Sequence, residues 1–326
     1  MSKTGEIASS EASHPPPASG QRSAQAIRQS LLQHVAGIAE LSKAEAIFVY
    51  VEALDEEKTL PLPESLRPKA YYVTKTAKED ERQQLLSNRY IRVPNVPLSR
   101  LGQVKIAILV ALSRGLVKQG DTVVFLSGLA TSGTLDTIIV TQVGREYEMF
   151  SSHSGAEPIP TDIRPEVIER VLDIASQLGS EGREGKPVGT LFVVGDSERV
   201  KSMSRQLILN PFRGYGENDR NILDTSLDET VKELSTIDGA FLVRGDGVIE
   251  CCGAFLKTTG QKEFELPLGL GARHHAAAGI TAVTSSLAVA VSESTGTVTV
   301  FKGGGLITEI EKPRPMGRSR KYTSGG

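Results

Sequence analysis

The chain has 326 residues, of which 39% are hydrophobic, 23% are charged and only 5% are aromatic, with no tryptophan. Its 37 Lys and Arg against 39 Asp and Glu give a formal net charge of -2, which argues against a protein that mainly grips a nucleic-acid backbone. No uninterrupted apolar run approaches membrane-spanning length, and the N-terminus lacks a signal core. We therefore expect a globular cytoplasmic protein with no membrane or nucleic-acid partner, in which the adjacent Cys251 and Cys252 stay reduced.

The N-terminal half of the chain predicts a small α/β domain after a flexible start. Residues 1–25 are rich in Ser, Ala and Pro and are expected to be disordered. Residues 26–150 alternate helices with short apolar strands, a pattern typical of α/β domains. The expected elements are a helix from Ala26, a strand at 46–51, a helix ending near Leu116, and strands at 122–126 and 135–144. The polar residues 151–163 then predict a linker.

Residues 164–311 predict a second domain with a mixed sheet surrounded by helices. Pro165 suits the first turn of a helix whose apolar side chains share one face over 166–178. The expected elements that follow are a strand in 189–196, a helix from Ser197, a helix with a capping box of Ser226 and Glu229, two strands around Gly245-Asp246-Gly247, and a hairpin around Thr295-Gly296. Residues 312–326 predict a flexible basic tail.

The stretch "LGLGARHHAAAG", residues 268–279, has the composition of an anion site at a helix start. Gly269 and Gly271 allow a sharp turn and close approach to a ligand, and Arg273 offers a planar fork for two phosphate oxygens. His274 and His275 could add donors. An ordinary glycine turn beside a solvated histidine pair explains the same residues equally well.

Two further segments place carboxylates near predicted strand ends. Asp238-Gly239-Ala240 stands at the head of an apolar strand, where an aspartate can hold a divalent cation or orient a hydroxyl. Ser292-Glu293 closes another strand with a hydroxyl and a carboxylate. Turn chemistry alone accounts for either segment. The glycine-rich residues 127–134 of the first domain could bind an anion, although a plain loop is the simpler interpretation.

The order of these segments resembles the diadenylate cyclase domain. The resemblance rests on Asp238-Gly239-Ala240, then residues 271–275, then Ser292-Glu293, and it extends over roughly residues 160–310. The first domain resembles the C-terminal domain of pyruvate kinase around residues 120–140, a pairing similar to the archaeal-type branch of these cyclases. Where many members read Gly-Thr-Arg-His-Arg, this chain has Ala272 and His275 in place of the threonine and the last arginine.

The resemblance implies an enzyme that joins two ATP molecules into cyclic di-AMP with Mn²⁺ or Mg²⁺, across a homo-oligomer interface where active sites face each other. It implies catalytic roles for Asp238, Arg273 and His274, and metal ligation by Asp238 and Glu293. The ATP-binding residues it implies are Gly239, Ala240, Gly271, Ala272, Arg273, His274, His275 and Ser292. The alternative is a non-enzymatic sensor that binds ATP or cyclic di-AMP in the same pocket. Whether the first domain is regulatory or only structural stays open.

Overall fold

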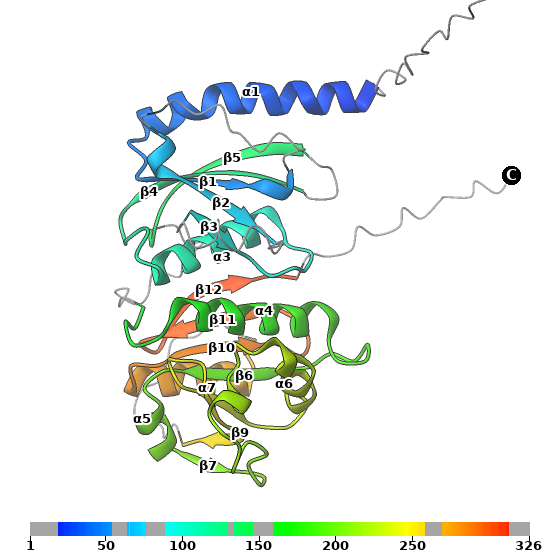
Figure 1. Cartoon of the computed structure of the whole chain (residues 1–326), viewed down its shortest axis with the longest axis vertical. Coiled ribbons are helices and arrows are strands. Elements are labelled where there is room, and N and C mark those ends of the chain that lie inside the picture. The colour runs from blue at the N-terminus through cyan, green and yellow to red at the C-terminus, as the bar shows by residue number, and fades with distance from the viewer. Residues whose placement is uncertain are drawn as a thin grey trace, which may run out of the picture.

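A computed structural model describes residues 19–53, 64, 66–75, 89–129, 134–145, 159–257 and 269–312. Two β-sheets with their helices follow one another along the long axis of the molecule (Figure 1). The fold is mixed α/β in both halves, as the sequence predicts. Most of the predicted N-terminal segment, linker and tail (residues 1–18, 151–158 and 313–326) lies outside the described residues.

The first domain is built on a five-stranded sheet. Its elements are α1 (Ser19–Leu41), β1 (Ala46–Tyr50), the short 3-10 helices η1 (Val51–Ala53) and η2 (Arg67–Lys69), β2 (Ala70–Thr74), β3 (Tyr90–Arg92), α3 (Arg100–Ser113), β4 (Thr122–Leu129) and β5 (Thr134–Gln142). The strand order is β3-β2-β1-β4-β5, with β5 alone antiparallel to its neighbour. Helix α1 covers one face of this sheet and α3 the other (Figure 1).

The first domain departs from the sequence-based expectation in two places. Helix α1 begins at Ser19, which corrects the expected disorder for residues 19–25. This stretch contains Ala, Gln and Arg, which are good helix formers, so the helix that starts the domain extends back into it. Strands β2 and β3 were not predicted. They have five and three residues, too short for a clear alternating pattern, although Tyr, Val and Thr favour a strand in β2.

The second domain is built on a seven-stranded sheet in the order β12-β11-β10-β6-β8-β9-β7. Its strands are β6 (Thr190–Val194), β7 (Ser204–Gln206), β8 (Ala240–Val243), β9 (Ile249–Leu256), β10 (Leu287–Val291), β11 (Val298–Lys302) and β12 (Gly305–Ile310). Its helices are α4 (Pro165–Glu181), α5 (Ser197–Ser202), η5 (Asn218–Arg220), η6 (Thr225–Leu227), α6 (Asp228–Leu234) and α7 (Ala272–Val283). Strands β6 and β8 are parallel, and all other neighbours are antiparallel.

Both faces of this sheet are buried, because α4 packs on one face and α7 on the other. Adjacent side chains along the strands are buried on opposite faces. Cys252 faces the core on the α4 side, whereas Cys251 belongs to the cluster on the α7 side. The two adjacent thiols thus point to opposite sides of the sheet, as alternation along a strand requires. Burial raises the pKa of Cys252 to about 11, so this thiol stays protonated and unreactive at neutral pH.

Of two predicted helix starts, the structure confirms one and contradicts the other. Pro165 occupies the first turn of α4, as expected. The capping box of Ser226 and Glu229 is wrong: the Asp224 side chain instead accepts a hydrogen bond from the Ser226 N–H at 2.9 Å, and Glu229 pairs with Arg183. Asp224 thereby caps η6, and α6 begins after Leu227 with no side chain capping it.

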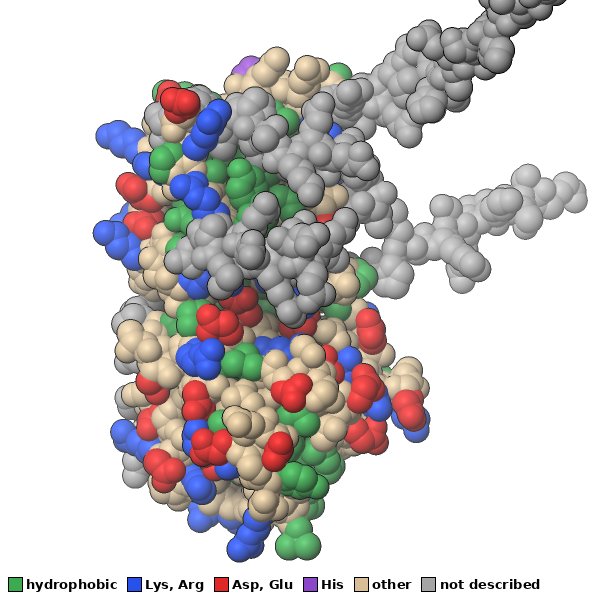
Figure 2. Space-filling model, viewed as in Figure 1, with side chains coloured by type: hydrophobic (Ala, Val, Ile, Leu, Met, Phe, Trp, Pro, Cys, Tyr) green, Lys and Arg blue, Asp and Glu red, His purple; other side chains and the backbone are tan. Residues whose placement is uncertain are grey.

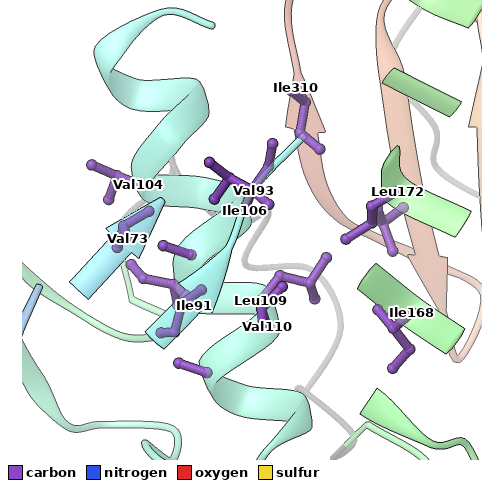
Figure 3. Close-up of a cluster of buried hydrophobic side chains, with 14 of the residues drawn as sticks. Val73, Ile91, Val93, Val104, Ile106, Leu109, Val110, Ile168, Leu172 and Ile310 are labelled. Carbon is purple, nitrogen blue, oxygen red and sulfur yellow. The ribbon is translucent and has the colours of Figure 1, made fainter. Parts of the chain in front are cut away.

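One continuous apolar core joins the two domains. Leu109 and Val110 of α3 lie opposite Ile168 and Leu172 of α4, with Ile310 of β12 beside them (Figure 3). Arg114, just after α3, forms an ion pair with Glu169 of α4 at 2.6 Å, and both side chains are largely buried. The first domain is therefore packed against the second through α3. Among the helices that the structure describes, none is both long and apolar enough to cross a bilayer.

Candidate active site

Three chain segments meet at one edge of the seven-stranded sheet. The pairing of β6 with β8 and with β10 sets the first residues of β6 and β8 beside the last residues of β10. Gly189 precedes β6, Asp238-Gly239 precedes β8, and Ser292-Glu293 follows β10. Sheet topology thus brings together segments that are about fifty residues apart in the sequence.

Helix α7 begins at the same edge, at Ala272, directly after the two glycines. Gly269 has a φ of +95°, in the left-handed region that favours glycine, which explains this residue before the helix. Gly271 is the N-cap and has no side chain with which to cap the helix, while the His274 N–H donates to its carbonyl at 3.0 Å. The preceding N–H groups have no acceptor within the helix, which makes this terminus suited to an anion.

Arg273 links the two predicted carboxylates. Its Nη2 lies 3.3 Å from Asp238 Oδ1, and its Nη1 lies 3.5 Å from Glu293 Oε2. Asp238 is 91% exposed and Glu293 63% exposed, so solvent weakens both contacts. The arginine and both acids can therefore exchange these contacts for a ligand at little cost. No group of three or more His, Cys, Asp or Glu arranged to hold a metal occurs among the described residues.

Two glycines allow close packing around the cluster of Arg273, Asp238 and Glu293. A Cβ at Gly189 would lie 2.7 Å from Arg273 Nη1, and a Cβ at Gly239 would lie 2.6 Å from the Gly253 backbone. Gly239 also has a φ of +110°. Gly239 therefore allows β8 to begin close against the Gly253 backbone, while its predicted part in ATP binding stays a prediction. Gly189 was not singled out, because a glycine before a strand is indistinguishable from an ordinary turn in the sequence.

The two histidines occupy different environments. His274 is 5% exposed and its ring meets Phe301 edge-on, with centroids 6.1 Å apart. Burial, with His275 and Arg273 nearby, lowers the pKa of His274, so its imidazole stays neutral at neutral pH. His275 is exposed on the outer side of the same turn. Of the pair, only His274 is built into the protein interior.

A pocket of about 480 Å³ adjoins this cluster. His274 and Ser292 line it, as do Thr297 and Thr299 of the β10–β11 hairpin and Glu309 of β12. His274 and Ser292 were predicted from the sequence as site residues, whereas Thr297, Thr299 and Glu309 were not. Their only signal is the alternation of hydroxyls in "TGTVT", which is equally typical of a half-exposed strand.

Ala240 and Ala272, which were also predicted, lie at the same edge, but their side chains can make few contacts with a ligand. Ala240 is buried in β8, so it can offer a ligand only its backbone. Ala272 is exposed at the first position of α7 and has no hydroxyl to offer. The structure therefore gathers the predicted residues in one place, with Arg273 in contact with both Asp238 and Glu293.

Comparisons with known proteins show what this part of the chain is similar to. Residues 177–306 match the family described as "DisA bacterial checkpoint controller nucleotide-binding". A protein named diadenylate cyclase from Methanocaldococcus jannaschii is 40% identical over 202 residues, which cover 62% of this chain and 63% of that protein. A diadenylate cyclase from Haloferax volcanii is 35% identical over 206 residues, which cover 62% of this chain and 72% of that protein. This chain belongs to the diadenylate cyclase family.

The matched region thus spans slightly less than two thirds of the Methanocaldococcus diadenylate cyclase. All the predicted site residues of the second domain, from Asp238 to Glu293, fall within the matched residues 177–306. Residues 28–150 match a family described as "Probable sensor domain DacZ_P", which coincides with the first domain. A crystal structure of DacA from Staphylococcus aureus aligns with 43% of this chain and 84% of its own, at 22% identity and a TM-score of 0.30.

Proposed function

We propose that the protein is a diadenylate cyclase, which converts two ATP molecules into cyclic di-AMP and two pyrophosphates. The observation that supports this most strongly is the placement of Arg273 between two exposed carboxylates, next to the residues His274 and Ser292 that line a hydroxyl-rich pocket. Phosphoryl transfer needs positioning and charge compensation rather than a covalent nucleophile, and this site offers both. Membership of the diadenylate cyclase family supports the same reaction.

The proposed chemistry is a displacement at phosphorus. The 3′ oxygen of one ATP bonds to the α-phosphorus of the other, the bond from that phosphorus to the pyrophosphate oxygen breaks, and the hydroxyl proton is released. Asp238, which is 91% exposed, accepts a hydrogen bond from the attacking hydroxyl and orients it. Arg273 offers its fork to the phosphate oxygens on which charge accumulates. A second displacement closes the ring.

The neighbouring residues bind the nucleotide. His274, neutral and buried in the pocket wall, can donate one hydrogen bond and accept another. Ser292 offers its hydroxyl, and Gly239, Ala240, Gly271 and Ala272 offer backbone groups. His275 is exposed and contributes at most a peripheral contact.

Asp238 and Glu293 also fit a divalent cation. Mg²⁺ and Mn²⁺ prefer oxygen ligands and are commonly bound by one or two carboxylates together with substrate phosphates and water. These two side chains supply that number and are exposed at one edge. When bound, such an ion would offset phosphate charge. The Arg273 guanidinium would then be released toward the substrate.

We propose a homo-oligomer in which two such sites face each other, because each ATP must attack the other. Support comes from exposed apolar residues beside the site. Leu209 is 93% exposed and Phe255 46% exposed, and Ile208 packs on Gly253, which adjoins the Asp238 carbonyl. Figure 2 shows hydrophobic side chains at the end of the molecule where Figure 1 places β7 and β9. A second copy would cover this surface and supply the second ATP, and with ATP as substrate we place the enzyme in the cytoplasm.

The test is product formation from ATP with Mn²⁺ or Mg²⁺, with GTP added in competition, followed by chromatography and mass spectrometry. We expect cyclic di-AMP from the natural chain and a loss of at least about a thousandfold in Asp238→Asn, which keeps the size of the side chain but not its charge. Asp219→Asn, at another exposed aspartate, is the matched control and should retain full activity. Nucleotide binding without pyrophosphate release would contradict the cyclase and favour a sensor.

A further inference from the structure

Thr299 lies in the wall of the pocket and has an unusual environment. Its side chain is 0% exposed, and its Oγ1 has no hydrogen-bond partner among the described residues. A buried hydroxyl without a partner costs free energy, and native proteins rarely leave one unless water or a ligand satisfies it. Because Thr299 lines the pocket, a ligand bound there would be within reach of this hydroxyl.

Strand geometry determines which way Thr299 faces. Its neighbours Val298 and Val300 belong to the core on the α4 side of the sheet. Side chains alternate along a strand, so Thr299 faces the α7 side together with Phe301, which touches the His274 ring. Thr299 therefore lies on the same side of the sheet as the proposed ATP-binding residues.

A row of hydroxyls leads from the Arg273 cluster toward Thr299. Ser292 and Ser294 lie at the end of β10, with their Oγ atoms 3.3 Å apart, and Thr297 precedes Thr299 by two residues on the same face. All four line the pocket. Neutral hydroxyl donors in a row suit an elongated anion with many oxygen acceptors, such as the polyphosphate of a nucleotide.

Charged groups of both signs surround the part of the pocket beside Thr299. Glu309 pairs with Thr299 across the two strands, and burial raises the pKa of Glu309. Lys105 of α3 opposes that shift, so the first domain supplies a positive charge near this acid. Glu311 and Lys312, which also line the pocket, form a second acid and base. This balance keeps the carboxylates from repelling a bound phosphate.

We propose that Thr299 is a nucleotide-binding residue that donates a hydrogen bond to the terminal phosphates, so that the part of the pocket beside Thr299 holds the part of ATP released as pyrophosphate. This inference rests on the proposed function, since it assumes that the pocket receives ATP. The α-phosphate stays at the Arg273 cluster, and the β- and γ-phosphates extend along the hydroxyl row. Thr299 thereby contributes to binding of substrate and leaving group without contacting the reacting atoms.

The experiment compares three variants of the full chain. Thr299→Val removes the hydroxyl and keeps the shape, and Thr299→Ser keeps the hydroxyl. Thr308→Val is the matched control, because Thr308 is 1% exposed in the adjacent strand and pairs with Val300, whose side chain faces the α4 side. Titration calorimetry measures binding of inorganic pyrophosphate and of AMP to each protein, with Mg²⁺ present. Thermal unfolding without ligand is measured in parallel.

We expect Thr299→Val to weaken pyrophosphate binding about tenfold, as for one lost hydrogen bond to a charged group, and to leave AMP binding unchanged. Thr299→Ser and Thr308→Val should bind pyrophosphate within about twofold of the natural chain. The melting temperature of Thr299→Val should not fall, since the variant replaces an unpaired buried hydroxyl with a methyl group.

Absence of pyrophosphate binding in the natural chain, or equal pyrophosphate binding by Thr299→Val, would overturn the inference. An equal loss for AMP would also overturn it, because Thr299 would then contact the nucleoside or α-phosphate. Neither ligand is turned over, so the outcome is independent of catalysis. Pyrophosphate loss in Thr299→Val without cyclic di-AMP production by the natural chain would leave the subsite in place and remove the proposed reaction.

Discussion

Two arginines in the second domain each contact two carboxylates, and they do so in opposite ways. Arg183, after α4, contacts Glu229 at 2.5 Å and Glu233 at 2.8 Å, two residues one turn apart on α6. Arg273 contacts Asp238 at 3.3 Å and Glu293 at 3.5 Å, from two separate segments at the sheet edge. The arginine side chains are 26% and 30% exposed, so exposure does not explain the difference.

The difference lies in how well each guanidinium is satisfied. The hydrogen bond from Arg183 lowers the pKa of Glu229, as expected for a tight contact. The Arg273 contacts are long, and its carboxylates come from two separate segments next to strand ends rather than from one helix. A satisfied arginine holds two elements together, whereas one with loose contacts keeps its donors for an incoming phosphate. Similar residue types thus serve structure in one region and the proposed binding site in the other.

The comparison is tested most strongly by Arg273→Lys. Lysine keeps the charge but loses the fork that reaches two oxygens, so we expect cyclic di-AMP formation at saturating ATP to fall by roughly a hundredfold or more. Arg183→Lys is the matched control and should change the rate by less than about twofold. Similar losses in both variants would mean that Arg273, like Arg183, has only a structural role.

A third arginine, Arg114, tests the case in which the ion pair is buried and only structural. Arg114→Met leaves Glu169 buried without its ion-pair partner, so the free energy of unfolding should fall by about 3 kcal/mol, measured with urea. Burial raises the pKa of Glu169, and loss of Arg114 raises it further. Protonation relieves the penalty, so the destabilisation should be smaller at acidic pH than at neutral pH. Adding Glu169→Gln should restore much of the loss, and failure to do so would refute the ion-pair explanation.

Gly189→Ala tests the space around Arg273. The added Cβ would lie 2.7 Å from Arg273 Nη1 and 3.0 Å from Glu293 Cβ, so the guanidinium must move. We expect about a tenfold lower rate of cyclic di-AMP formation with little change in melting temperature. Gly37→Ala, where a Cβ meets nothing within 4 Å, is the control. Full activity of Gly189→Ala would show that the position of Arg273 is not critical.

The sequence allowed most of the architecture and the contacting trio to be predicted. Alternating helices and apolar strands indicated an α/β fold, and Gly271 indicated the start of α7. Polar and glycine residues at strand and helix ends made Asp238, Arg273 and Glu293 candidates, and the resemblance to the diadenylate cyclase domain selected them. Such interruptions are visible in the sequence since they break the local pattern.

Residues that obey the local pattern could not be found in this way. Thr299 alternates correctly along its strand, and its significance depends on the absence of a partner in the folded protein. The approach of Lys105 to Glu309 requires α3 of one domain to pack against β12 of the other, a long-range contact with no sequence period. The capping box failed because the short helix η6, which the sequence pattern does not reveal, precedes α6 and is capped by Asp224.

The contact between α3 and β12 has a further consequence for assembly. Strand β12 is the outermost strand of the seven-stranded sheet, and such strands present unpaired backbone groups that can recruit a strand from another molecule. Helix α3 of the first domain packs against β12 and thereby covers this edge of the sheet. Removing the first domain would expose the β12 edge, so the isolated second domain should be prone to edge-to-edge aggregation.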